Sequence, residues 1–401
     1  MATVHPFKAL RPSPEHAEEI ACVPYDVINT AEARSLAKGK PLSFLHVIRP
    51  EIDLPEGVDE HIDAVYETGA ANLKAYAQSK HSIMEERPAL YVYRIIMDSR
   101  SQTGIFACVS VDDYDSNVIL KHELTRPVKE DDRTRHIVEQ QAHAEPVMLT
   151  YKDDSNVSDI ITQTVAGTAL YDLTTDDGVQ HTIWRVADTN ALVKCFESIE
   201  NLYVADGHHR CKAASRAAAE SSQGSAGGEH RFFPAVLFPM GDMKILAYNR
   251  IIRKLPTSPE VFLEQLKSRF TLSEIDNPVP SERGDICIYI DQRWFSMSMP
   301  EGKTSTVTDQ LDVGRLTDSI LTPMLGITDP RRDPNIDFVG GIRGTDELIR
   351  LVSEGKAEMA ISMYPTSIEE LVDVSDAGLL MPPKSTWFEP KLRSGLLVHL
   401  F

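Results

Sequence analysis

One short segment constrains the fold of this 401-residue sequence most. In it, an apolar stretch leads directly into a glycine turn and an alanine-rich helix. Leu202–Ala205 is apolar, D-G-H-H-R follows at residues 206–210, and the Ala-rich stretch Cys211–Glu220 is typical of a helix. A buried strand joined to a helix by one tight turn directs backbone N–H groups and the positive helix end toward one spot. The sequence therefore predicts an anion site at this D-G-H-H-R turn.

The side chains of the D-G-H-H-R turn support the same interpretation. Gly207 would let the backbone approach a phosphate closely, and His208, His209 and Arg210 add donors, of which arginine can bind phosphate in a bidentate manner. Asp206 could hold Mg²⁺ or a substrate amine or hydroxyl. The alternative is that Asp206 only caps the helix and the histidines lie in a solvated turn. The grouping of two histidines and an arginine after a buried strand favours a binding function.

A second charged segment, residues 121–136, follows a predicted strand and leads into a predicted helix. Glu123 beside His122 could act as a general base. Four basic residues are candidates for a phosphate clamp: Arg126, Lys129, Arg133 and Arg135. The zinc signature H-E-x-x-H is absent because Arg126 occupies the position of the second histidine. A solvated helix face remains the alternative for so dense a mixture of charges.

Charge and composition exclude several classes of protein. The chain has 41 Lys+Arg against 60 Asp+Glu, a formal net charge of −19, which opposes coating of nucleic acid or an anionic membrane by bulk charge. No apolar run approaches the roughly 20 residues of a membrane-spanning helix. The five scattered cysteines lack C-x-x-C spacing and are typical of reduced thiols. We therefore expect a cytoplasmic protein with no nucleic-acid or membrane partner.

Periodicity along the chain predicts a mixed α/β (α+β) protein with antiparallel strand pairs. An amphipathic helix is expected around 59–80, and two strand-like runs, Ala89–Met97 and Gly104–Val111, are separated by a polar turn. The Gly- and Ser-rich stretch Ser221–Glu229 is predicted to be a loop. A break near Pro256–Ser258 suggests a boundary between two parts, residues 1–255 and 256–401. The sequence contains no P-loop, Rossmann or G-x-S-x-G motif.

Two further segments and the tail are weaker candidates for a site. Pro24–Val27 and His46–Pro50 could line a pocket, but they also fit a turn and the end of a strand. The tail motif M-P-P-K-S-T-W-F-E-P-K at residues 381–391 could form an ordered lid. The alternative is a C-terminal strap that packs Trp387 and Phe388.

Four motifs in order give the chain a family resemblance over nearly its whole length: K-H-E-L-T-R-P-V-K-E-D-D-R-T-R-H, V-A-D-G-H-H-R-C-K-A-A, I-D-F-V-G-G at 336–341, and the tail motif. Together they resemble the domain of unknown function 1015 (DUF1015). The D-G-H-H-R turn is further similar to the phosphate motif of the ParB/sulfiredoxin fold, which includes partition proteins, sulfiredoxins and free-serine kinases that use ADP or ATP. This resemblance implies a ParB/sulfiredoxin-like nucleotide-binding core in 1–255 and a smaller C-terminal α/β subdomain in 256–401.

The resemblance also ranks the possible activities. Sulfiredoxins carry a catalytic cysteine where this chain has His208, and Cys211 lies beyond the arginine at a helical position. Partition proteins carry a DNA-binding helical domain, which a net charge of −19 opposes. Free-serine kinases share D-G-H-H-R and have a glutamate ahead of it that is proposed as the catalytic base. By that resemblance Glu123 would be the base, with His122 beside it.

The leading hypothesis is a small-molecule kinase that transfers a phosphoryl group from ATP or ADP to a hydroxyl, with free L-serine as acceptor and O-phosphoserine as product. Residues 207–210 would hold the nucleotide phosphates, and Asp206 would bind Mg²⁺ or the acceptor. Three basic residues would stabilise developing charge: Arg126, Lys129 and Arg133. The alternative is a nucleotide-binding regulatory or scaffold protein without turnover.

Overall fold

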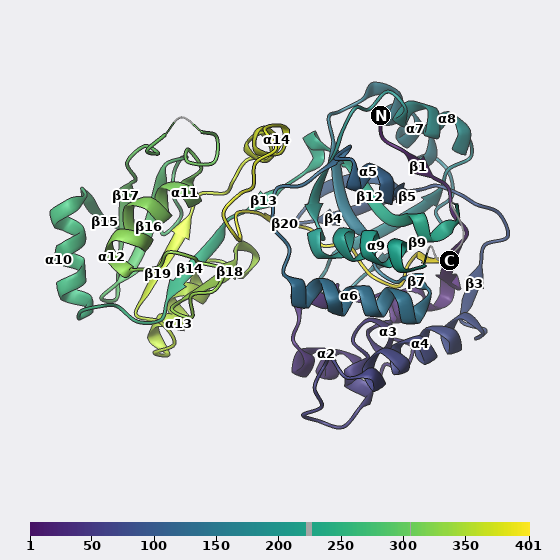
Figure 1. Ribbon diagram of the computed structural model, residues 1–401, viewed down its shortest axis with the longest axis horizontal. Helices are drawn as coiled ribbons and strands as arrows, with labels where there is room; N and C mark the ends of the chain where they lie inside the picture. Colours follow the sequence, from purple (N-terminus) through teal and green to yellow (C-terminus); the bar gives the residue numbers. More distant parts are fainter. Residues whose placement is uncertain (222–226, 305) are drawn as a thin grey trace. The chain divides into compact units, whose positions relative to one another are not determined.

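The computed structural model describes residues 1–221, 227–304 and 306–401 (Figure 1). The chain divides into two compact units. The first unit contains Met1–Lys121, Thr125–Met243 and Pro390–Phe401, and the second contains His122–Leu124 and Lys244–Glu389. Both units combine helices with antiparallel strand pairs, which confirms the predicted mixed α/β class. The predicted loop at 221–229 falls mostly outside the described residues.

A nine-stranded sheet forms the centre of the first unit. Its strands run in the order β6-β11-β8-β12-β5-β4-β10-β9, and β1 pairs with β5. Their bounds are β1 (Val4–His5), β4 (Tyr91–Met97), β5 (Arg100–Ser110), β6 (Ile119–Leu120), β8 (Val147–Tyr151), β9 (Tyr171–Thr174), β10 (Gln180–Arg185), β11 (Leu202–Asp206) and β12 (Phe232–Pro239). The pairs β11/β6 and β12/β8 are parallel, and the other pairs are antiparallel. The two strand-like runs predicted at 89–97 and 104–111 correspond to β4 and β5, which pair antiparallel, and β5 begins earlier than expected, at Arg100.

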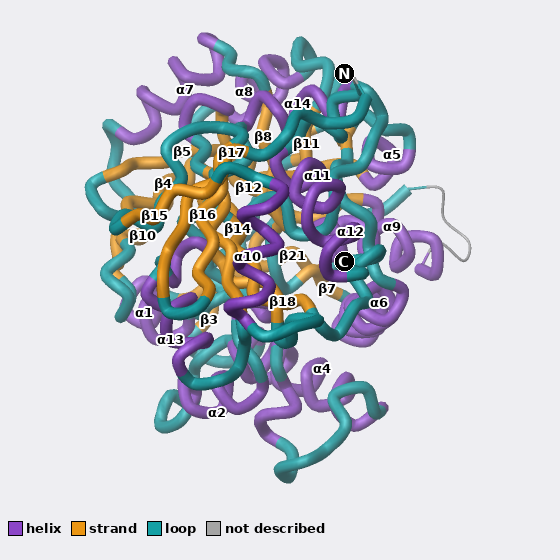
Figure 2. Tube along the Cα trace, turned by 90° about the vertical axis from the view of Figure 1, so that its left-hand side faces the viewer, coloured by secondary structure: helices purple, strands orange, loops and turns teal. Residues whose placement is uncertain are grey.

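Helices cover the strands that carry the D-G-H-H-R turn. The helices of this part are α5 (Val111–Asp115), α6 (Pro127–Gln140), α7 (Ser155–Val165), α8 (Thr189–Phe196) and α9 (His208–Ser221). Helices α6 and α9 lie side by side in both views (Figure 1 and Figure 2). Arg216 of α9 joins them, because its guanidinium nitrogens lie 3.3 Å from Glu130 and 2.6 Å from Asp131 of α6. The charged segment thus packs along the helix that begins at the turn.

Both ends of the chain enter a second, four-stranded sheet of the first unit. Its order is β3-β2-β21-β7, with bounds Ser82–Met84, Ala9–Pro12, Val398–Leu400 and Ala142–His143. Ala9 pairs with His399, so the N-terminal β2 and the C-terminal β21 are antiparallel neighbours. Four helices accompany this sheet: α1 (Ala17–Ile20), α2 (Thr30–Ala37), α3 (Leu45–Ile48) and α4 (Asp63–Ala77). The helix expected at 59–80 corresponds to α4.

The second unit is built on a six-stranded antiparallel sheet in the order β15-β17-β16-β19-β14-β18. Its strands are β14 (Tyr248–Ile252), β15 (Leu272–Ile275), β16 (Asp285–Ile290), β17 (Arg293–Ser298), β18 (Ile336–Gly340) and β19 (Met359–Met363). Separate apolar clusters lie around Ile252 and Ile288 and around Ile251 and Tyr289, as expected for strands with alternating faces. The helices are α10 (Pro259–Arg269), α11 (Asp312–Leu316), α12 (Thr322–Leu325), α13 (Asp346–Ser353) and α14 (Ile368–Asp376).

Each unit is built from segments that are separated in the sequence. Strand β14 precedes the expected break near Pro256–Ser258 yet belongs to the second unit, and Pro390–Phe401 belongs to the first.

All five cysteines are free thiols. Among the described residues, no helix combines the length and apolar character needed to cross a bilayer.

The third and fourth motifs meet within the second unit. Strand β20 (Trp387–Phe388) of the tail motif pairs antiparallel with β13 (Ile245–Leu246). The indole of Trp387 covers Gly340, where an added Cβ would lie 2.8 Å from three ring carbons. The glycine of I-D-F-V-G-G therefore makes room for the tail, which agrees with the strap interpretation.

We expect Gly340→Ala to destabilise the protein by about 1–3 kcal/mol, because the added methyl group would lie 2.8 Å from the Trp387 ring and force it to shift. The backbone of Gly340 has an ordinary φ of −61°, so the cost is steric. Thermal or urea denaturation measures it. Gly227→Ala is the control, since its Cβ would meet no atom within 4 Å. Equal stabilities of the two variants would contradict the packing role.

Candidate phosphate-binding turn

The D-G-H-H-R turn has a geometry that only glycine accommodates at its second position. Strand β11 ends at Asp206 and α9 begins at His208, with Gly207 between them at φ +102°. An added Cβ on Gly207 would lie 3.1 Å from both Val147 Cγ1 and Arg210 Nε. The N–H of Cys211 donates to the Gly207 carbonyl at 2.9 Å and closes the first helical turn. The N–H groups ahead of it are the donors with which a helix start binds anions.

Arg210 is directed into the protein rather than into solvent. Its guanidinium donates to the Pro146 carbonyl and to Oδ2 of Asp206, the latter at 3.2 Å, and the residue is 7% exposed. Burial opposes its charge, but Asp26, Asp206 and Glu145 outweigh burial and raise the pKa of Arg210 above its ordinary value. The arginine therefore stays positively charged and stabilises the turn from inside the protein.

The two histidines of the turn bring little positive charge to it. Burial lowers the pKa of His208 to about 3, despite the opposing effect of Asp206, so its imidazole is neutral near pH 7. His209 is half-buried, and its Nε2 accepts a hydrogen bond from the backbone N–H of Arg126 at 3.1 Å. That bond needs the lone pair of Nε2, which assigns the ring proton to Nδ1. The bond also ties the start of α6 to the start of α9.

Asp206 interacts with two cations through one oxygen. Its Oδ2 lies 3.2 Å from Nη2 of Arg210 and 3.5 Å from Nζ of Lys391. Lys391, the last residue of the tail motif, was not among the site residues expected from the sequence. Over the described ranges, no group of three or more His, Cys, Asp or Glu is arranged to hold a metal ion. One carboxylate still fits Mg²⁺ where substrate phosphates and water supply the other oxygens.

The basic residues predicted on the charged segment occupy three different environments. Arg126 is exposed at the N-cap of α6, and Lys129 is half-buried one turn later. Arg133 is buried: its guanidinium lies 2.8 Å from Asp132 and stacks 4.0 Å from the ring centre of Tyr25. Arg126 and Lys129 remain available to a ligand at the surface, whereas Arg133 is held within the protein.

His122 and Glu123 group with the second unit. The carbonyl of His122 accepts a hydrogen bond from the N–H of Met381 at 2.7 Å, and its Nε2 lies 3.3 Å from Oγ1 of Thr386. The charged segment therefore contacts the tail motif at this point. Glu123 is half-buried. Its pairing with the D-G-H-H-R turn stays a prediction.

Glu145 is a residue of the neighbourhood that the sequence did not single out. Its carboxylate accepts bonds from the Tyr25 N–H at 3.1 Å and the Ser394 hydroxyl at 3.2 Å, and lies 3.7 Å from Arg133. The side chain is 6% exposed, and burial raises the pKa of Glu145 above its ordinary value even though Arg210 and Arg133 oppose the shift. The only signal in the sequence is an acid two residues before the apolar strand Val147–Tyr151.

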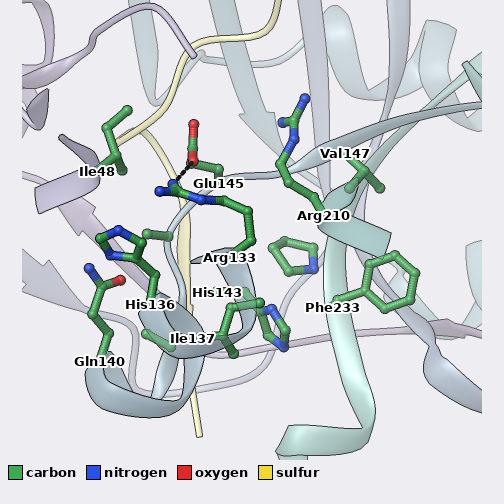
Figure 3. Close-up of a pocket in the computed structure, with 13 residues that line it drawn as sticks. Ile48, Arg133, His136, Ile137, Gln140, His143, Glu145, Val147, Arg210 and Phe233 are labelled. Atoms are coloured by element: carbon green, nitrogen blue, oxygen red, sulfur yellow. Dashed lines mark ion pairs between the residues drawn. The ribbon is translucent and has the colours of Figure 1, made fainter. Parts of the chain in front are cut away.

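A small cavity lies behind the turn (Figure 3). It has a volume of about 40 Å³, and its ionisable lining residues are Arg133, His136, His143, Glu145 and Arg210. Figure 3 shows the ion pair between Arg133 and Glu145, with the guanidinium of Arg210 turned away from His143. Burial lowers the pKa of His136 and of His143 well below the ordinary value. The space suits a water molecule and is far below the roughly 300 Å³ of a typical ligand pocket, so a nucleotide at this turn has to bind outside the cavity.

A family model described as "Protein of unknown function (DUF1015)" matches residues 4–314, more than half of the sequence. The chain belongs to the DUF1015 family. This confirms the resemblance carried by the four motifs, and the family description assigns no reaction. No curated protein matches this DUF1015 chain significantly.

Several solved structures resemble this DUF1015 protein at low similarity. C-terminally truncated SbnI from Staphylococcus aureus has a TM-score of 0.39 and 13% identity, over 74% of this chain and 87% of that one. A free serine kinase in complex with AMP has a TM-score of 0.36 and 13% identity, over 73% and 92%. A conserved hypothetical protein from Pyrococcus furiosus also has a TM-score of 0.36 and 13% identity, over 73% and 95%. Such identities are too low to transfer a function.

Removing the carboxylate of Glu145 should destabilise the protein. We expect Glu145→Ala to lower the free energy of unfolding by about 1–3 kcal/mol, because the buried N–H of Tyr25 and the hydroxyl of Ser394 lose their acceptor, while Arg133 keeps Asp132. Glu145→Gln keeps the shape and the acceptor and should cost less. Urea denaturation followed by circular dichroism measures both. The exposed Glu139→Gln on α6 is the control, and a loss below about 1 kcal/mol in Glu145→Ala would contradict the role of the carboxylate.

The neutral state of His208 predicts a dependence of stability on pH. Because its pKa is about 3 when folded and its ordinary value is 6.5, the unfolded chain binds the proton more tightly. The stability is present above pH 6.5 and is lost as the pH falls toward 3. His208→Gln should flatten the slope by up to one proton, about 1.4 kcal/mol per pH unit, in denaturation curves between pH 7 and 4. His16→Gln, at a more exposed site, is the control, and an unchanged slope in His208→Gln would contradict the assignment.

Proposed function

We propose that this DUF1015 protein is a small-molecule kinase that transfers a phosphoryl group from ATP or ADP to a hydroxyl acceptor. The observation that carries the proposal is the D-G-H-H-R turn, where Gly207 at φ +102° opens helix α9 directly after a sheet strand. Glycine there keeps the backbone bare, and the first N–H groups of α9 are suited to phosphate oxygens. Free L-serine is the first acceptor to test, because the turn resembles that of free-serine kinases.

The nucleotide phosphates would bind to backbone N–H groups at residues 208–210. The positive end of α9 adds favourable electrostatics, equivalent to about half a charge at close range. Arg126 and Lys129, near the start of α6, are the predicted side chains that would reach the outer phosphates. The bond between His209 Nε2 and the Arg126 N–H holds the starts of α6 and α9 together, which supports a shared ligand.

The chemical step requires charge neutralisation and alignment more than covalent help from the protein. The acceptor oxygen would form a bond to the terminal phosphorus while the bond to the bridging oxygen breaks, releasing ADP from ATP or AMP from ADP. Glu123 would take the hydroxyl proton, with His122 beside it. Asp206 is the carboxylate that would hold Mg²⁺, and the ion, when bound, neutralises phosphate oxygens.

The second candidate is a nucleotide-binding regulatory or scaffold protein. Asp206 Oδ2 already interacts with Arg210 and Lys391, and a carboxylate engaged in this way is also suited to holding the turn without supporting catalysis. This candidate shares the binding site and lacks turnover. Neither candidate requires a nucleic-acid or membrane partner.

A direct assay separates the two candidates. Purified protein with ATP or ADP, Mg²⁺ and L-serine should produce O-phosphoserine, detected by mass spectrometry. Glu123→Gln should lower turnover by at least about 100-fold with nucleotide affinity retained, because the general base is lost. Glu139→Gln, an exposed glutamate of α6, is the matched control and should keep full activity.

Two outcomes would contradict the kinase. The first is tight nucleotide binding without turnover on any hydroxyl amino acid, which would leave the regulatory candidate. The second is full turnover in Glu123→Gln, which would remove the proposed base.

A further inference from the structure

Lys391 lies beside the D-G-H-H-R turn although 185 positions separate it from Asp206 in the sequence. It belongs to Pro390–Phe401, the stretch that returns to the first unit. Its Nζ lies 3.5 Å from Oδ2 of Asp206, and its side chain is 14% exposed. The contact is long for a hydrogen bond and is best described as an ion pair.

The backbone around Lys391 is firmly held. Two residues later, the guanidinium of Arg393 donates to His181 Nε2 at 3.2 Å and also pairs with Asp177. The N–H of Arg393 donates to the Tyr93 hydroxyl at 3.3 Å. The N–H of Ser394 bonds to the Cys22 carbonyl at 2.9 Å. The segment that follows Lys391 is therefore fixed by hydrogen bonds, and it positions Lys391 beside Asp206.

The charges of the turn show why this lysine matters. His208 is neutral because burial lowers its pKa, the Nε2 of His209 is an acceptor, and the guanidinium of Arg210 is directed to Pro146 and Asp206. The side chains within the turn therefore supply no outward positive charge comparable with that of an ammonium group. Lys391 brings a full positive charge to the carboxylate at the end of β11.

We propose that Lys391 binds the phosphates of the nucleotide, with Asp206 as the residue that positions its ammonium group. The inference rests on the proposed nucleotide site and adds its ligand class: a nucleoside di- or triphosphate, recognised through its charge. An ammonium group has three N–H donors, so a contact with Asp206 is compatible with a bond to a phosphate oxygen. The preference for ADP over adenosine then depends on Lys391.

Calorimetric titrations with ADP and with adenosine test the assignment. Lys391→Met keeps the aliphatic stem and removes the charge, and we expect it to raise the Kd for ADP about 10- to 100-fold, the loss of one charge-assisted bond. The Kd for adenosine should stay unchanged. Lys391→Arg should recover most of the ADP affinity. Lys40→Met is the matched control, because Lys40 also pairs with an aspartate of the first unit, Asp176 at 2.9 Å.

The outcomes separate this inference from the proposed function. Wild-type protein that binds neither ADP nor ATP would overturn the nucleotide site itself. Wild-type binding with an unchanged Kd in Lys391→Met would overturn only the role of the lysine. An equal loss of affinity for adenosine and ADP would show that Lys391 acts through packing rather than through phosphate charge, and would also overturn it.

Discussion

The buried contact of Glu145 with Arg133 is the interaction on which the first unit depends. Charges removed from water are tolerated only when paired and hydrogen-bonded, and here the partners come from three separate parts of the chain. The N–H of Tyr25, the hydroxyl of Ser394 and the guanidinium of Arg133 meet at one carboxylate, and the charge of Arg210 opposes its protonation. The N-terminal turn at Tyr25, α6 and the C-terminal segment therefore meet at a single acid.

The residues at the D-G-H-H-R turn form a buried layer and a surface layer with different roles. Arg210, the residue that the sequence marks most strongly as a phosphate ligand, belongs to the buried layer and keeps the turn in place. The surface layer consists of the bare backbone at Gly207, the start of α9 and Lys391. Arg210 thus has a structural role in the turn, and the positive charge at the surface of the turn comes from Lys391, a residue distant in the sequence.

Local patterns in the sequence predicted the parts of the fold that depend on neighbouring residues. The antiparallel pair β4/β5 and the strand–turn–helix at 202–220 follow from periodicity and turn chemistry. Glu145 and Lys391 were missed because their partners lie 120 and 185 residues away, and no periodicity encodes such contacts. The interleaving of the two units was missed for the same reason. The boundary at 256 was inferred from composition, whereas contacts between distant strands decide which unit a segment joins.

The return of Pro390–Phe401 to the first unit has a consequence for biosynthesis. Strand β21 fills the position between β2 and β7, and Ser394 completes the bonds of Glu145. Domains of a nascent chain generally fold from the N-terminus onward. The first unit cannot be completed until residues after 389 have been synthesised. Before that point most of its core residues are present, but strand β21 and Lys391 are missing. All residues of the second unit precede Pro390 in the chain, so its synthesis is complete before that of the first unit. A prematurely terminated chain would therefore lack Ser394, strand β21 and Lys391.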